Sequence, residues 1–363
     1  MGLQIALQFD SMKGDVLKQY LLGFLALILV FIGVPFAASA QAPLCSRIFA
    51  TDIKVRELNE LARLRVMTYN LENFNYNVRK LDRDPRAQEK YENIAEVILD
   101  QRPEVLVLQE VHSKKSLEDF NSDLLQDRYE VFVVSGNESG GMNLAFMLKR
   151  DLNLKTEIKS HKDQEWYDPA QKEVDYLFDR DFPALILREG NKDHPALIVF
   201  AHHGKSMMDR PGDPKSVKMR TEQIRRMEEI LIKFSETYGK ETPTIVAGDF
   251  NTDVLRSSEI SSLKNVFRDV FDFSPIVRDL FDRYTHTFHP HLGPTQATAL
   301  DAIFVNGTLR DSIKSARVFH YRDEMGFEKP LPTSSAERAE NPSDHFPIIV
   351  DIDVQPLLGV EIY

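Results

Sequence analysis

The sequence predicts an α/β (α+β) protein: a four-layer α/β/β/α sandwich in which two mixed sheets pack face to face beneath outer helices. Short, uninterrupted apolar runs, typical of strands buried on both faces, recur along the chain. The helical patterns fall between groups of strands instead of alternating with single strands, which favours two packed sheets over one doubly wound sheet. The apolar fraction of 42% and the charged fraction of 28% are those of a globular domain.

The first half of the domain shows this pattern in order. Apolar residues at helical spacing, such as Tyr91, Ile94 and Ile98, predict an amphipathic helix that Pro103 ends. We expect these elements here: strand Leu64–Tyr69 ending at Asn70, helix Arg86–Gln101, strand Val105–Leu108, helix Ser116–Leu125, and strands Tyr129–Val134 and Leu144–Leu148.

The second half begins with a polar stretch, Lys155–Asp181, which we interpret as a long loop with a short helix or hairpin. The remaining apolar runs and one long helical pattern predict the following elements: strands Pro183–Leu187 and Ala196–Ala201, helix Lys218–Tyr238, a strand beginning at Thr244, and strands Tyr284–Phe288, Ala299–Val305, Ser315–Phe319 and Phe346–Val354.

The N-terminus has the features of a signal peptide. An uncharged apolar run, Leu21–Phe36, follows Lys13 and Lys18 and precedes the small residues Ala38-Ser39-Ala40, the order found in secretory signals. Cleavage after Ala40 predicts a secreted or periplasmic protein without stable membrane association. The alternative is an uncleaved membrane anchor, since the run approaches the length of a span. The predicted segments are signal peptide 1–40, extension 41–62, catalytic domain 63–355 and tail 356–363.

Charge and cysteine content limit the classes of function. The net charge of -11 argues against a protein that binds nucleic acid over its whole surface. An acidic chain suits hard divalent cations instead. The single cysteine, Cys45, excludes an intramolecular disulfide and a thiolate metal cluster.

Polar side chains that can bind a metal or move a proton recur where the predicted strands end. Asp249 and Asn251 are two residues apart, so they project to the same side of an extended chain. Asp301 interrupts an apolar run, where an unpaired carboxylate is costly. The other strand-end residues are Asn70, Glu110, His203, Asp344 and His345. Each alone has a structural explanation as a turn, a cap or a buried core histidine, but their recurrence on most strands predicts one shared site.

Six segments carry a family resemblance: TYNLENF, VLVLQEV, HHGKS, GDFN, ALDAIFV and PSDHFP. They resemble, in order, the motifs of the endonuclease/exonuclease/phosphatase superfamily, the fold of deoxyribonuclease I and exonuclease III. The resemblance covers about residues 63–355, and the Lys-Ser after the first catalytic histidine is most similar to secreted bacterial nucleases.

The resemblance implies a divalent cation bound by Glu110, with Asn70 and Asp344 nearby. Oxygen ligands of this kind suit Mg²⁺, which keeps several waters and also binds substrate phosphates. Mg²⁺ is therefore the expected cofactor, with Mn²⁺ or Ca²⁺ able to substitute or assist.

The resemblance also implies the catalytic roles. His345, held by Asp301, is the expected base that activates water. Asp249 is expected to orient that water, and Asn251 to hold a phosphate oxygen. His203 is expected to stabilise developing charge or to protonate the leaving oxygen.

Two features stand apart from this assignment. Where many family members have an acidic residue that supports the first histidine, this chain has Asn143, which leaves the charge of His203 open. His286, His289 and His291 suggest a zinc site as an alternative. Their spacing disfavours it, because it directs the three rings apart in a strand that prolines follow.

A basic run follows the HHGKS motif: Lys205, Arg210, Lys215, Lys218, Arg220, Arg225 and Arg226. We interpret this run as a rim for a polyanionic substrate, with Lys205 and Arg220 in contact with it, rather than as a solvated loop and helix face.

The expected function is that of an exported, monomeric, Mg²⁺-dependent nuclease that hydrolyses DNA or RNA. The alternative is a phosphatase or phospholipase C-type enzyme of the same fold, acting on phosphoinositides or sphingomyelin. The basic run and the lack of an obvious exposed aromatic hairpin favour nucleic acid. An inactive binding module is disfavoured, because every motif residue that the chemistry needs is present.

Overall fold

The computed structural model describes residues 56–77, 79, 84–138, 140–168, 171–274, 280–290 and 294–358. The predicted signal peptide with its cleavage site, Cys45, most of the predicted extension and the last residues of the predicted tail lie outside these ranges. Among the described helices, none is long and apolar enough to cross a membrane.

Two six-stranded sheets confirm the predicted architecture. The first has the order β15-β16-β1-β2-β4-β3, and only its β1–β2 pair is parallel. Its strands are β1 (Leu64–Phe74), β2 (Val105–Val111), β3 (Tyr129–Val134), β4 (Asn143–Lys149), β15 (Ile313–Val318) and β16 (Ile348–Ile352). Both sheets are mixed, as the sequence predicted.

The second sheet has the order β11-β14-β10-β9-β8-β5, and only its β9–β10 pair is parallel. Its strands are β5 (Leu154–Lys159), β8 (Ala184–Glu189), β9 (Leu197–His203), β10 (Thr244–Asp249), β11 (Arg268–Asp269) and β14 (Asp301–Val305).

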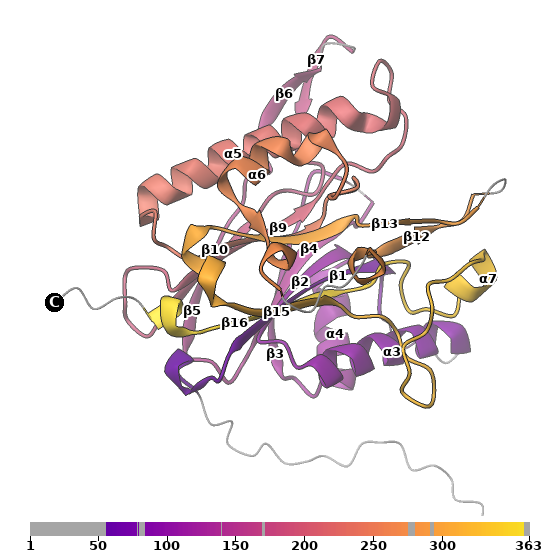
Figure 1. The fold of residues 1–363 in the computed structure, drawn as a ribbon, viewed down its shortest axis with the longest axis horizontal. Coiled ribbons are helices and arrows are strands. Elements are labelled where there is room, and N and C mark those ends of the chain that lie inside the picture. Colours follow the sequence, from indigo (N-terminus) through magenta and orange to yellow (C-terminus); the bar gives the residue numbers. More distant parts are fainter. Residues whose placement is uncertain are drawn as a thin grey trace, which may run out of the picture. The chain divides into compact units, whose positions relative to one another are not determined.

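Helices form the outer layers (Figure 1). The first sheet is covered by α3 (Pro85–Gln101) and α4 (Lys114–Leu124), the second by α5 (Val217–Tyr238) and α6 (Ser261–Val266). Helix α3 begins where the side chain of Asp84 accepts hydrogen bonds from two backbone N–H groups, and it ends at Arg102 in the left-handed conformation before Pro103. The apolar residues that predicted this helix are buried.

The two-residue period of the strands determines what faces the space between the sheets. In β10, Ile245 and Ala247 belong to the core between the sheets, whereas Val246 packs with Ile224 beneath α5. Asp249 continues the series of Ile245 and Ala247, so its side chain is directed toward the inter-sheet face at the end of the strand. The core pattern thus places this carboxylate opposite the other sheet.

The polar stretch Lys155–Asp181 is only partly the loop that was predicted. It contains the expected hairpin, β6 (Glu165–Asp168) and β7 (Glu173–Tyr176), but it also contributes most of β5, which the sequence did not predict. Strand β5 lies at the edge of its sheet and carries charged residues, so it lacks the apolar run of a central strand.

Smaller elements complete the described chain. The hairpin of β12 (His286–Phe288) and β13 (Gln296–Thr298) and the short helix α7 (Ser335–Arg338) lie near the C-terminal motif. The 3₁₀ turns are Leu58–Glu60, Pro214–Ser216, Ser258–Ile260, Val270–Asp272, Phe281–Arg283, Gly307–Ser312 and Gln355–Leu358.

Candidate active site

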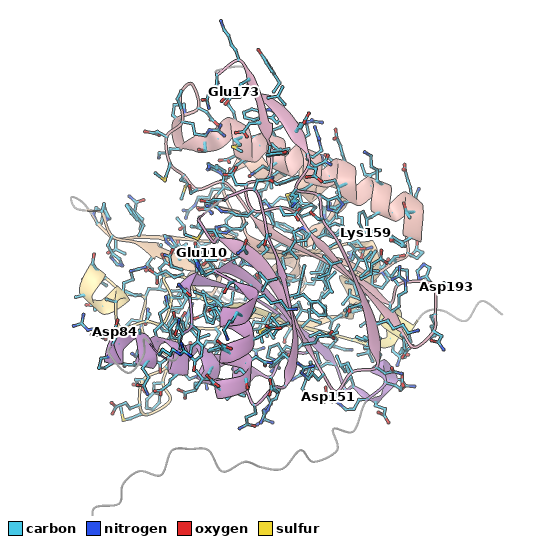
Figure 2. The ribbon with its side chains drawn as sticks, turned by 180° about the vertical axis from the view of Figure 1, so that it is seen from behind. Asp84, Glu110, Asp151, Lys159, Glu173 and Asp193 are labelled. Atoms are coloured by element: carbon cyan, nitrogen blue, oxygen red, sulfur yellow. The ribbon has the colours of Figure 1, made fainter. Side chains whose placement is uncertain are left out.

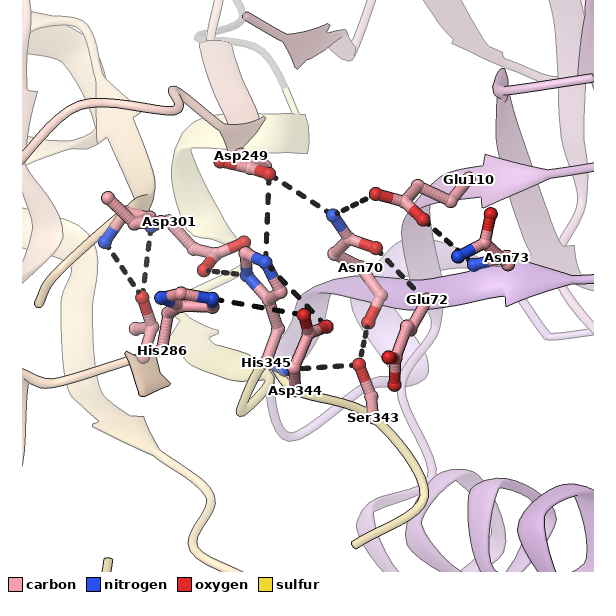
Figure 3. A network of polar contacts seen from close by, with 12 residues as sticks. Asn70, Glu72, Asn73, Glu110, Asp249, His286, Asp301, Ser343, Asp344 and His345 are labelled. Atoms are coloured by element: carbon pink, nitrogen blue, oxygen red, sulfur yellow. Dashed lines mark hydrogen bonds and ion pairs between the residues drawn. The ribbon is translucent and has the colours of Figure 1, made fainter. Parts of the chain in front are cut away.

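Asp249 is the residue where the two sheets meet. It ends β10, in register with His203 of the parallel strand β9 and with Asp301 of the antiparallel strand β14. Side chains in register lie on the same face, and Nε2 of His203 is 3.5 Å from Oδ2 of Asp249. From the first sheet, Asn70 Nδ2 donates to the same oxygen at 3.1 Å (Figure 3). The predicted strand-end residues therefore converge.

Gly248 permits this approach of β9 and β10. Its φ of +149° is a conformation that residues with a side chain rarely adopt, and a Cβ there would lie 1.8 Å from the carbonyl oxygen of His202. His202 itself faces away from the site, between the rings of Phe182 and Phe250. Burial lowers its pKa to about 3. Of the two adjacent histidines, only His203 faces the site.

His345 and Asp301 form the predicted pair. Nδ1 of His345 is 2.7 Å from Oδ2 of Asp301, which leaves Nε2 facing Asp249 at 3.8 Å. The backbone of His345 is also held, since its N–H donates to Ser343 Oγ and its carbonyl accepts from the Tyr321 hydroxyl. The imidazole is thus fixed at one nitrogen and available at the other.

The buried carboxylates determine the charge of the site. Burial disfavours protonation of His345, but Asp301, Asp249 and Asp344 together outweigh it and hold the pKa of the imidazole well above its usual value. Burial raises the pKa of Asp249 to about 7; the charge on His345 opposes this shift, and Asp301 and Glu110 add to it. The site therefore holds protons readily.

His203 lacks a carboxylate on its far side. Its Nδ1 is buried with no hydrogen-bond partner among the described residues, and Asn143 donates instead to the carbonyl of His112. Burial, followed by the charge on Arg180, holds the pKa of His203 well below its usual value. The imidazole is therefore neutral near pH 7, which answers the question that Asn143 raised.

Asn251 supports Asp249. Its backbone N–H donates to Oδ1 of Asp249 at 2.7 Å, and its Nδ2 lies 3.2 Å from Oδ2 and 3.1 Å from the carbonyl oxygen of Gly204. The predicted contact of Asn251 with a phosphate would need these amide donors, which are engaged inside the protein. Its left-handed backbone, at φ +50°, is one that asparagine tolerates better than most residues.

Glu110 lies on the other side of the site, at the end of β2. Its Oε1 accepts from Asn70 Nδ2 at 3.2 Å, and its Oε2 accepts from the backbone N–H of Asn73 at 2.8 Å. Asn70 thus donates to both Glu110 and Asp249, while its oxygen accepts from the N–H of Glu72. In this orientation Asn70 positions two carboxylates and does not offer its own oxygen to a cation at Glu110.

The donor set fits a hard divalent cation. Four carboxylates surround the site: Glu110, Asp249, Asp301 and Asp344. Among the described residues, Arg338 is the only lysine or arginine paired with any of them, through Asp344 at 3.1 Å. Clustered carboxylates of this kind are costly without positive charge, and their oxygens are the ligands that Mg²⁺ and Ca²⁺ prefer. Glu110 and Asp344 are the residues with exposed carboxylate surface.

Comparison with known proteins agrees with this geometry. A model of the Endonuclease/Exonuclease/phosphatase family matches residues 67–345. The chain belongs to this family. It is accordingly a hydrolase of phosphoric esters, as its motifs predicted. A search of curated proteins by sequence finds no match.

Solved structures share the fold at low sequence identity. An endonuclease/exonuclease/phosphatase family protein from Bacteroides thetaiotaomicron is 19% identical with a TM-score of 0.54, over 80% of this chain and 94% of that chain. A mannosyl-6-phosphatase from the same organism is 19% identical with a TM-score of 0.53, over 80% and 99%. TDP2 from D. rerio, complexed with a single-strand DNA product, is 15% identical with a TM-score of 0.54, over 81% and 100%.

Beyond the predicted family residues, His286 belongs to the site. Its ring lies 4.8 Å from that of His345, and its Nε2 is 3.8 Å from Asp344. The zinc alternative grouped it with two other histidines, but His289 bonds to Thr295 and His291 is outside the described residues. The sequence does not show that a bridge between β12 and the C-terminal motif joins His286 to His345.

Arg338 and Ser343 were also missed. Arg338 pairs with both Glu72 and Asp344, and Ser343 Oγ donates to the carbonyl of Asn70 at 2.7 Å. Ser343 lies within the PSDHFP motif and could have been selected from it. Arg338 lies just outside that motif, in a polar segment without a distinctive pattern.

The two predicted substrate contacts are directed elsewhere. Arg220 is only 2% exposed; its Nε pairs with Glu259 at 2.8 Å, and its Nη1 donates to the carbonyl of Lys205. In this arrangement the Arg220 guanidinium is held inside the protein, and its predicted contact with substrate stays a prediction. Lys205 is partly exposed, but its Nζ pairs with Asp179 at 2.5 Å.

The basic run is largely neutralised. Five of its seven cations pair with carboxylates: Lys205 with Asp179, Arg210 with Asp168, Arg220 with Glu259, and Arg225 and Arg226 with Glu229. Lys215 and Lys218 are the exposed members without an ion pair among the described residues. The electrostatic argument for nucleic acid is weaker than the sequence indicated.

An exposed aromatic hairpin is present, contrary to the prediction. Tyr167, Val174 and Tyr176 share one face of the β6–β7 hairpin and are 56%, 60% and 45% exposed. Figure 2 shows Glu173 on this projecting hairpin, away from Glu110 in the centre of the domain. Most neighbours of these residues in the sequence are polar, so the sequence did not indicate that the three residues share an apolar face.

Proposed function

We propose that this hydrolase is a divalent-cation-dependent phosphodiesterase that cleaves nucleic acid, with DNA as the first substrate and RNA as the second. The observation that carries the proposal is the His345–Asp301 pair, whose free Nε2 faces Asp249 across 3.8 Å. A base that is oriented by one carboxylate and faces another can take a proton from a water held between them.

The residues then have distinct roles. Asp301 fixes the tautomer of His345, and Nε2 of His345 accepts the proton of the attacking water. Asp249 orients that water, and Asn251 and Asn70 hold Asp249 in place through the hydrogen bonds described above. His203, being neutral, donates a hydrogen bond to a phosphate oxygen instead of transferring a proton.

Glu110, with Asp344, would hold Mg²⁺, which when bound neutralises charge on the phosphate and its leaving oxygen. Binding positive charge beside these carboxylates also reduces their hold on the His345 proton, so the imidazole becomes neutral at lower pH. The carboxylates that raise the pKa of His345 are thus the groups that would hold or adjoin the cation.

Support for nucleic acid comes from the six motifs and from the fold shared with TDP2 bound to a DNA product. A phosphatase or phospholipase C-type activity is the second candidate. The exposed apolar face of the β6–β7 hairpin would suit a lipid surface, and a mannosyl-6-phosphatase shares the fold.

A single assay separates these candidates. Plasmid DNA, RNA, sphingomyelin, a phosphoinositide and mannose 6-phosphate are each incubated with the protein in Mg²⁺ or in chelator, beside the Asp249→Ala variant. We expect cleavage of DNA or RNA that chelator and Asp249→Ala both abolish. Hydrolysis of lipid or sugar phosphate alone would replace the nuclease proposal with the second candidate.

We also propose export, on the signal-like segment that ends at Ala40. Expression of the full chain followed by mass measurement of the product should give a protein that begins at Gln41 outside the cytoplasm. A full-length product in the membrane fraction would support the anchor alternative.

A further inference from the structure

We propose that His286, Asp344 and His345 form a second cation site, which binds a borderline transition metal such as Zn²⁺ and shares Asp344 with the proposed Mg²⁺ site at Glu110. One ligand atom from each residue lies within 4.8 Å of the others. The three residues come from β12 and from the C-terminal motif, which an antiparallel bridge between His286 and His345 joins.

The distances fit a shared ion better than direct bonds. Asp344 directs Oδ2 toward Nε2 of His286 at 3.8 Å and Oδ1 toward Nε2 of His345 at 4.0 Å (Figure 3). Both separations are too long for hydrogen bonds. Two atoms that each bind one ion at about 2.1 Å can be at most about 4.2 Å apart, so both pairs can share an ion after small shifts.

The imidazoles are prepared for ligation. Nδ1 of His345 is engaged by Asp301, so Nε2 is directed into the site and can bind an ion in exchange for its proton. A histidine held by a carboxylate at its other nitrogen is the usual arrangement of a metal-bound imidazole. His286 is mostly enclosed, and its Nδ1 is buried without a hydrogen-bond partner among the described residues.

The ligand class follows from the two nitrogen donors. Imidazole suits Zn²⁺, Cu²⁺, Fe²⁺ and Ni²⁺, whereas Mg²⁺ prefers oxygen. Arg338 competes for this site, since its Nη2 pairs with Oδ2 of Asp344, the oxygen that faces His286. Glu72 offers Arg338 a second carboxylate, so the arginine keeps a partner when Asp344 binds an ion.

Occupancy would have a functional consequence. An ion on Nε2 of His345 removes the atom that the proposed hydrolysis uses as its base, so Zn²⁺ should inhibit the Mg²⁺-supported reaction. This consequence rests on the proposed function, but the binding of the ion does not.

Calorimetric titration of the full chain with Zn²⁺, in excess Mg²⁺, tests the site without catalysis. We expect one Zn²⁺ to bind, and His286→Asn to weaken that binding by at least about tenfold, the smallest loss usual for a removed supporting residue. His289→Asn, a change of the same kind three residues away, should bind like the parent. Arg338→Met should bind Zn²⁺ more tightly, because a competing cation is removed.

Equal Zn²⁺ affinity in the parent and a folded His286→Asn variant would overturn the proposal. Ring ¹⁵N spectra of the parent protein provide a test that does not depend on folding of the variant. Zn²⁺ should shift Nε2 of two histidines, assigned to His286 and His345, and spectra without such shifts would also overturn it. If Zn²⁺ binds as expected but no substrate is hydrolysed, the site stands and the proposed function fails.

Discussion

Two charged regions of the molecule differ in how their charges are paired: the strand ends around Asp249, and the basic run from Lys205 to Arg226. At the strand ends, four carboxylates share Arg338 and the imidazolium of His345 that they stabilise, among the described residues. In the basic run, five of seven cations already pair with carboxylates. Unbalanced buried charge is costly and is retained where a ligand completes it. The comparison supports the proposal that the strand ends receive a cation, whereas most of the basic run pairs with carboxylates of the fold.

The largest effect should follow a change at the strand ends. His345→Ala removes the proposed base, so kcat should fall by roughly 10²–10⁴, the usual contribution of a positioned acid or base. His194→Ala, a histidine bonded to Thr242 outside the site, is the matched control. Rates on the cleaved substrate in Mg²⁺ measure both. A His345→Ala rate close to that of the control would remove His345 from the reaction.

Asp301→Asn should change the pH dependence as well as the rate. His345 must be neutral to accept a proton, so activity falls as the pH drops through its pKa. The carboxylate of Asp301 raises that pKa. Removing its charge lowers the pKa, and the acidic limb of the kcat profile should move to lower pH while the maximal rate falls. A limb that stays in place would show that another group sets it.

Arg220 should matter for stability instead of substrate binding. Breaking a buried ion pair by removing one partner costs about 3–5 kcal/mol, and Arg220→Met leaves Glu259 without its arginine. Urea unfolding should show this loss. If Arg220→Met left stability unchanged and raised KM, Arg220 would be a substrate contact. The contrast between the strand ends and the basic run would then fail.

The smallest expected effect is on the salt dependence of KM, which should distinguish basic residues without an ion pair from those that have one. If the substrate is double-stranded DNA, replacing Lys215 and Lys218 with Ala should reduce the salt dependence of log KM by up to about 2, since each phosphate contact contributes about 0.9. Replacing Arg225 and Arg226 with Ala should leave it nearly unchanged, because both are paired on the helix surface. Equal reductions in the two double variants would contradict this distinction.

Residues placed by strand periodicity were predictable from the sequence. Asp249 and His203 end apolar strands and Asp301 begins one. The two-residue period of these strands fixes the side of each residue, so their convergence needed only the pairing of neighbouring strands. The fold class was predictable for the same reason, since central strands are apolar on both faces. Edge strand β5 was not, because its charged face resembles a loop.

Residues whose surroundings come from distant segments could not be predicted. The sequence shows Arg220 as one cation in a basic helix, but Glu259 lies 39 residues further on and buries it. A β-bridge brings His286 to the site, and the short helix α7 brings Arg338. Neither element shows a periodic pattern of apolar residues in the sequence. A run of charged residues in the sequence is therefore a poor predictor of a binding surface, whereas polar residues at strand ends are a good predictor of an active site.

The central claim is that His345 and Asp301 act as one unit on water beside Asp249. A double-mutant cycle of kcat, with His345→Ala, Asp301→Asn and the combined variant, tests it most directly. Because Asp301 acts only through His345, the combined variant should be as slow as His345→Ala, within about threefold. Two losses that multiply in the combined variant would contradict the account, since Asp301 would then act independently of His345.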